Sequence, residues 1–173
     1  EIDDINNENP PYELASRSSH PADKMQQELE QEWLKENLNA DVKEFEGLTI
    51  NNNIVLGYVK DQTIFLNSQM RSNGTLYHEA FHYTFRYLFD KPTRDKLITE
   101  IQSDSKYDSH FTKAAVSKFR TDRNYNPTIS DEDVRRTIAE EILADKFKGF
   151  ALEKQKRTEK IGIVRAFLKL LDK

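Results

Sequence analysis

The segment from residue 75 to residue 89 constrains the fold of this chain most strongly. Apolar residues occupy nearly every side of a helix drawn through it: Leu76, Tyr77, Ala80, Phe81, Phe85, Leu88 and Phe89. A helix that is apolar all round is a buried helix, so other elements must cover it. Asp90 precedes Lys91 and Pro92, which predicts a stop there. We therefore predict a domain built around this one helix.

Residues 41–68, which come before this helix, have the composition of strands. β-branched and aromatic residues predominate, and turn-forming residues interrupt them at Asn51-Asn52-Asn53, Gly57 and Asp61-Gln62. This pattern predicts a small antiparallel sheet of about three strands that packs on the buried helix.

Helical spacing marks the flanking segments. It predicts a helix from Pro21 anchored by Trp33, helices over 93–104, 109–120 and 131 to about 153, and a last amphipathic stretch from Ile161 to Leu171. Ser130 and Asp133 have the spacing of a capping box at the start of the long helix. A small sheet followed by several helices predicts an α+β fold.

Length and charge limit the classes of function. The 173 residues suit one domain over 21–173, with the polar, turn-rich residues 1–20 as a flexible arm or linker. A net charge of −4 argues against nucleic acid as a partner, and no apolar run is long enough to cross a bilayer. We expect no signal peptide and no membrane partner, and a cytoplasmic or virion-associated protein rather than a secreted one. Because cysteine is absent, any metal must be held by His, Asp and Glu.

The buried helix carries the motif His78-Glu79-Ala80-Phe81-His82. Its two histidines are one helical turn apart on one face, so both imidazoles can bind one tetrahedral ion. Glu79 projects to the side of that face, where its carboxylate can take a proton from a metal-activated water as general base. Buried histidines and acids need partners, and one zinc ion per chain would serve all three.

The predicted long helix supplies candidates for the third ligand that a catalytic zinc needs. One stripe of this helix contains Val134, Ile138, Glu141, Ile142 and Asp145. Acids within an apolar stripe need a partner or a metal, so we predict Glu141 as ligand and Asp145 as acceptor of a ligand histidine's second ring N–H. Glu140, about 100° round the helix, is the alternative ligand; it has Ala144 one turn later and so lacks such a partner.

His78-Glu79-x-x-His82 followed by Glu141-x-x-Ala144-Asp145 resembles the gluzincin superfamily of zinc metallopeptidases, which includes the thermolysin and neprilysin families. The run Ala144-Asp145-Lys146-Phe147 is similar to compact zincins of bacteriophages and mobile elements, and to phage-encoded domains within polyvalent proteins. The resemblance implies a zincin-like fold, and it implies that Ile64 to Asn67 form the edge strand that pairs with bound peptide.

The expected function is thus a zinc-dependent endopeptidase, a hydrolase acting on protein or peptide substrates. The alternative is a zinc-binding interaction or structural module of a larger phage-type polyprotein with little turnover. A metal-free helical adaptor is a third interpretation. Tyr107, His110 and Tyr125 are candidates for stabilising the oxyanion. The substrate and the oligomeric state stay open at this point.

Overall fold

The computed structural model describes residues 12–15 and 22–156. Its sheet has the strand order β1-β4-β5-β2, with β3 paired to β4 outside this path. The strands are β1 (Tyr12–Leu14), β2 (Asp41–Phe45), β3 (Thr49–Ile50), β4 (Asn53–Lys60) and β5 (Thr63–Asn67). The helices are α1 (Lys24–Asn37), α2 (Thr75–Tyr83), a π-helix η1 (Thr84–Leu88), α3 (Lys91–Ser103), a 3-10 helix η2 (Ser105–Phe111), α4 (Lys113–Asp122) and α5 (Asp131–Lys156). The α+β class is as predicted.

Two tight turns organise the centre of the sheet. Asn51 and Asn52 join β3 to β4 with φ of 48° and 64°, and Asp61 and Gln62 join β4 to β5 with φ of 48° and 57°. A two-residue turn with both φ values positive matches the right-handed twist of an antiparallel pair. Two of the three predicted interruptions thus mark the β3–β4 and β4–β5 reversals, whereas Gly57 lies inside β4 and interrupts no strand.

The sheet itself differs from the three antiparallel strands predicted. In the described residues it has five strands, and β2 runs parallel to β5 from Asp41 opposite Thr63 to Phe45 opposite Asn67. Parallel neighbours are joined through a crossover rather than a tight turn, so local turn signals do not reveal them. The prediction of an edge strand at 64–67 is wrong, because β5 lies between β4 and β2.

One edge of the sheet is formed by a segment expected to belong to the arm. Residues 12–14 form β1, which pairs antiparallel with β4. Tyr12 and Leu14 alternate with Glu13, but three residues are too few for a two-residue period to identify a strand. For these residues the prediction of a loose arm is wrong, and the chain around the core begins earlier than residue 21.

The helix predicted at 75–89 is buried over 75–85 but not to its end, where Leu88 is 57% exposed. All nine residues of α2 are buried, and the last turn widens into η1, a π-helix over Thr84–Leu88. The start of α3 also differs slightly, since Asp90 caps it and Pro92 lies in its first turn. The segment predicted as a helix from 109 begins as 3-10 and becomes α4 only at Lys113.

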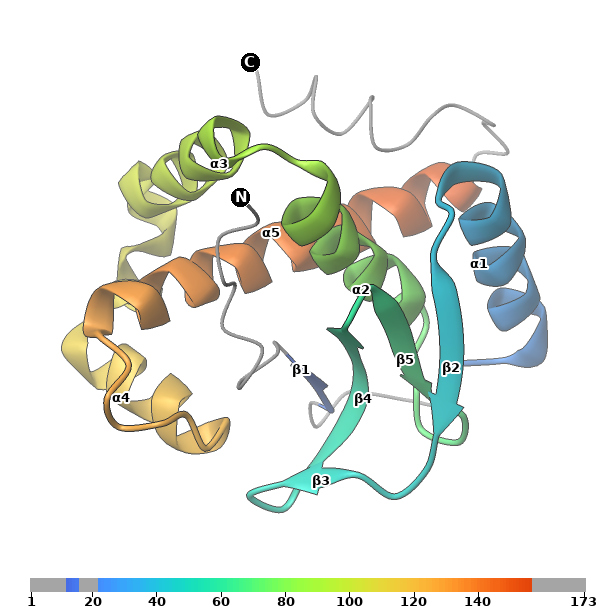
Figure 1. Cartoon of the computed structure of the whole chain (residues 1–173), viewed down its shortest axis with the longest axis horizontal. Helices are drawn as coiled ribbons and strands as arrows, with labels where there is room; N and C mark the ends of the chain where they lie inside the picture. Colours follow the sequence, from blue (N-terminus) through green and yellow to red (C-terminus); the bar gives the residue numbers. More distant parts are fainter. Residues whose placement is uncertain (1–11, 16–21, 157–173) are drawn as a thin grey trace.

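Figure 1 shows α5 running across the length of the described fold, with α2 between α5 and the sheet. Trp33 of α1 is the predicted anchor: its ring meets Tyr77 of α2 edge-on at 5.0 Å and lies 6.1 Å from Phe147 of α5. Aromatic side chains of this size dominate the burial energy of a small core. Ser130 caps α5 as predicted, accepting the Asp133 N–H at 3.1 Å.

A carboxylate from α1 holds the beginning of α2. Gly74, the cap residue, has φ of 82° and supplies no side chain, so the first N–H groups of the helix need another acceptor. Glu30, only 2% exposed, accepts the Gly74 N–H at 2.6 Å and the Leu76 N–H at 3.4 Å. Its negative charge also suits the positive end of the helix dipole.

Within the described residues, no helix is both long and apolar enough to cross a membrane. The predicted amphipathic stretch from Ile161 to Leu171 lies outside these residues.

Candidate metal centre

Helix α2 aims two imidazoles at one point. His78 and His82 are 1% and 0% exposed, and their Nε2 atoms are 3.0 Å apart. One helical turn separates the two residues, so they share the face that α2 turns toward α5. This convergence follows from the spacing seen in the sequence.

Helix α5 brings Glu141 to the same point. Its Oε2 lies 3.5 Å from His78 Nε2, and its Oε1 lies 3.6 Å from His82 Nε2. The ligand atoms of the three side chains all fall within 4.8 Å of one another. Donors bound tetrahedrally at roughly 2.0–2.1 Å would be about 3.3 Å apart. The three residues therefore match a small tetrahedral ion in both chemistry and spacing.

Each histidine has a second acid behind it. His78 Nδ1 is 3.0 Å from Asp145 Oδ1, and His82 Nδ1 is 2.7 Å from Glu140 Oε1. The sequence predicts that Asp145 accepts the second ring N–H of a ligand histidine, but it presents Glu140 only as an alternative ligand without a partner. The structure places Glu140 on the other side of His82 from Glu141. Glu140 and Glu141, which are adjacent in α5, therefore lie at the two ring nitrogens of His82. The sequence prediction considers only the residues on one stripe of the helix and so does not anticipate this.

These contacts set the tautomers of the two rings. An ionised carboxylate only accepts hydrogen bonds, so each Nδ1 must donate its proton. In the neutral rings both Nε2 atoms then carry lone pairs, which face each other and the Glu141 carboxylate. Glu141 Oε1 itself has no hydrogen-bond partner among the described residues. Such a group of acceptors requires a proton or a cation in its midst.

Two arginines balance the buried acids. Arg86 Nε donates to Glu140 at 2.8 Å, and Arg123 donates to Glu141 Oε2 at 3.3 Å. Burial by itself would raise the pKa of each carboxyl, but the charge of Arg86 on Glu140 and of Arg123 on Glu141 is the largest cause that lowers it, and both pKa values come to about 2. Both glutamates are therefore anionic at neutral pH, as metal coordination requires of Glu141. Neither arginine was singled out from the sequence.

Glu79 lies beside the cluster, against the sheet. It is 0% exposed, and neither carboxylate oxygen has a hydrogen-bond partner among the described residues. Burial is the main reason that its pKa is well above the ordinary value. Gly57 of β4 makes room for it: a Cβ there would lie 2.8 Å from Glu79 Cγ. An unpartnered carboxyl with a raised pKa is typical of an acid–base group.

Of the three oxyanion candidates, Tyr125 is the one whose pKa is affected by Glu141 of the cluster. Burial raises the pKa of its hydroxyl, and the charge of Glu141 raises it further. The hydroxyl has no hydrogen-bond partner in the described part of the chain. Tyr107 and His110 instead pair with each other on η2, with ring centroids 6.2 Å apart, and His110 is exposed.

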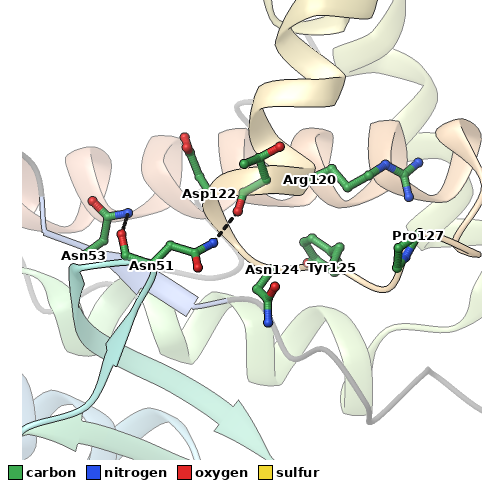
Figure 2. Close-up of a pocket in the computed structure, with 8 residues that line it drawn as sticks. Asn51, Asn53, Arg120, Asp122, Asn124, Tyr125 and Pro127 are labelled. Carbon is green, nitrogen blue, oxygen red and sulfur yellow. Dashed lines mark hydrogen bonds between the residues drawn. The ribbon is translucent and has the colours of Figure 1, made fainter.

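A pocket of about 460 Å³ opens next to Tyr125 (Figure 2). It lies between the β3–β4 turn, which contributes Asn51 and Asn53, and the loop that joins α4 to α5. Asn51 reaches across and donates to the Thr121 carbonyl. The Tyr125 ring stacks on Phe119, with centroids 5.9 Å apart. Tyr125 therefore lines this pocket, although the residue is only 8% exposed.

Comparison with known proteins adds no relative: no family model, curated protein or solved structure matches the chain. The case for a function consequently rests on the geometry of the cluster and on the motif.

Proposed function

We propose that the chain is a zinc-dependent endopeptidase of the gluzincin type, with His78, His82 and Glu141 as ligands of one zinc ion. One observation carries this proposal: the Nε2 lone pairs of two buried imidazoles and the carboxylate of Glu141 converge on one point. Oε1 of that carboxylate has no hydrogen-bond partner among the described residues. Three protein ligands leave a fourth position for water or substrate, which is the rule for catalytic zinc.

The donor types favour zinc over the common hard cations. Two imidazoles and one carboxylate suit zinc, whereas magnesium and calcium prefer sites made wholly of oxygen. His78 and His82 each have a carboxylate on the far ring nitrogen, at 3.0 and 2.7 Å. Such outer carboxylates fix the tautomer and raise the basicity of ligand histidines.

Zinc held by His78, His82 and Glu141 would supply a Lewis acid that acidifies water and polarises the scissile carbonyl. Glu79 takes the proton of the attacking water on its carboxylate and delivers it to the leaving amine. Glu140 and Asp145 hold the imidazoles in place. Tyr125 is our candidate for donating a hydrogen bond to the carbonyl oxygen as negative charge develops.

The alternative of a structural zinc module is less well supported. A structural site has no use for Glu79, whose charged form is opposed by complete burial and by the absence of a hydrogen-bonding partner. The zincin-like fold is part of the proposal; support comes from a motif helix packed between a sheet and a second helix that bears the third ligand.

Metal analysis of the purified chain tests the ligand set. We expect about one zinc per chain in the wild type and little in His82→Ala and Glu141→Ala, with His110→Ala as control because that histidine is exposed. A wild type that stays metal-free after incubation with zinc would refute the proposal.

A second assay separates enzyme from module. Glu79→Gln keeps the shape of the side chain but removes its basicity, so zinc should stay bound while cleavage of a peptide library is lost. Equal residual cleavage by the wild type and Glu79→Gln would favour the structural module.

A further inference from the structure

Strand β1 lies against the part of β4 that faces the base. Glu13 is paired directly with Gly57, the residue whose missing Cβ makes room for Glu79. Side chains of directly opposed residues in an antiparallel pair point to the same face of the sheet. The Glu13 side chain is therefore directed to the α2 side, next to the catalytic motif.

The Glu13 carboxylate is buried rather than solvated. The residue is 7% exposed, and Oε1 forms an ion pair with Lys148 of α5, one turn beyond the helix stretch that carries Glu141 and Asp145. Oε2 has no hydrogen-bond partner among the described residues. Lys148 thus provides a positive charge that binds a carboxylate beside the proposed metal centre.

The part of this strand that the structure describes is short and irregular. It has three residues, its pairing is irregular between Glu13 and Leu14, and Leu14 is only half-buried. After it, the Ala15 N–H donates to the Ile54 carbonyl at 2.8 Å. Backbone pairing plus one recognised side chain is the way in which a sheet edge binds an extended peptide.

We propose that the outer edge of β4 is a peptide-binding strand, that residues 12–14 occupy it as an intramolecular ligand, and that it selects extended peptides with an acidic side chain held by Lys148. This inference rests on the proposed function in one respect: a peptide beside Glu79 is a substrate only if Glu79 is the general base. It also replaces β5, which lies inside the sheet, as the strand that receives peptide.

Because residues 12–14 occupy the edge of β4, another peptide can bind there only by displacing them. A tethered segment acts at an effective concentration in the millimolar range, so a peptide present at micromolar concentration does not displace it. Weakening β1 without harming β4 should therefore open the edge.

The test uses the full chain in a Glu79→Gln background, so that no probe is cleaved and binding is measured apart from turnover. Glu13→Lys places a positive charge against Lys148, and Glu36→Lys on the exposed side of α1 is the control for the same charge change. The probe is a fluorescein-labelled synthetic peptide with the sequence of residues 10–17. A second probe carries lysine in place of Glu13.

In Glu13→Lys we expect amide hydrogen exchange at residues 12–15 to accelerate about tenfold to hundredfold, the range for one charge-assisted hydrogen bond. The first probe should then bind at least about tenfold more tightly than it binds the Glu36→Lys control, and the second probe should not bind. The double variant Glu13→Lys with Lys148→Glu should restore slow amide exchange at residues 12–15 and should again exclude the first probe. Glu13→Gln, a milder change, should act in the same direction if the lysine variant does not fold.

Unchanged protection of residues 12–15 in both Glu13 variants would overturn the inference, because β1 would then be an ordinary structural strand. Exchange that accelerates without any gain in probe binding would overturn it as well. Probe binding by a chain that holds no zinc and cleaves nothing would refute the enzyme while leaving this peptide site intact.

Discussion

Gly57→Ala is the sharpest test of how the sheet positions Glu79, the proposed general base. Gly57 has no left-handed backbone, so glycine is required for space alone. An added Cβ would lie 2.8 Å from Glu79 Cγ, 2.9 Å from Glu79 Oε1 and 3.1 Å from Thr75 Cγ2, whereas ordinary contact begins at 3.4 Å. Glu79 is fully buried and α2 is backed by α5, so neither can simply move away.

The displacement needed is roughly 0.6 Å, the difference between 2.8 and 3.4 Å. Overpacking of this kind costs about 1–3 kcal/mol, which lowers Tm by roughly 2–12 °C in a domain of this size. Misplacing a catalytic group by about 1 Å costs about a hundredfold in rate, so we expect kcat to fall about tenfold to hundredfold. Zinc content should not change, because the nearest atoms to the added Cβ belong to Glu79 and Thr75 and not to the proposed ligands.

The assay is peptide hydrolysis with zinc content measured on the same sample, together with thermal unfolding. Gly149→Ala is the matched control: nothing lies within 4 Å of its added Cβ, and it is in the interior of α5. That variant should be neutral or gain about 1 kcal/mol from helix propensity. Full activity in Gly57→Ala would refute the reasoning that Glu79 is positioned by this contact.

Three further perturbations probe the surroundings of the site. Glu140→Ala leaves Arg86 buried without its partner, so chemical denaturation should show a loss of about 3–5 kcal/mol, and a loss below 1 kcal/mol would contradict a buried pair. Glu30→Ala removes the acceptor of the Gly74 N–H, and the free energy of unfolding should fall by about 1–3 kcal/mol; an unchanged value would show that water replaces the carboxylate. Zinc at about a thousand times its Kd should raise Tm by roughly 8–16 °C in the wild type, and the same addition to Glu141→Gln should give a much smaller rise.

The helical period explains why much of the cluster could be anticipated. A spacing of four residues places His78 and His82 on one face whatever surrounds the helix, and the same geometry puts Glu141 and Asp145 on one stripe of α5. Apolar residues on all sides of residues 75–89 required burial, and the structure buries all of α2. These features depend on residues that are close in sequence. The same holds for the start of α5, where Ser130 accepts the N–H of Asp133.

Contacts between distant segments could not be anticipated in this way. The roles of Glu140 and Glu30 depend on how α5 and α1 cross α2, because a carboxylate outside the apolar stripe has no local signal that it meets His82 or the Gly74 N–H. Arg86 and Arg123 likewise resemble ordinary charged residues until the helices are packed.

The division between sequence and tertiary structure is plainest at the sheet. The β-branched and aromatic composition of residues 41–68 and their turn-forming residues predict strands there, since both signals come from residues adjacent in sequence. Which strands become neighbours is decided by burial of the whole sheet against α2, and this places β2 parallel to β5 and β1 at the open edge of β4. The sequence by itself therefore determines a buried helix that carries the His78-Glu79-x-x-His82 motif, and only the tertiary structure decides which strand edge lies beside that motif and what occupies it.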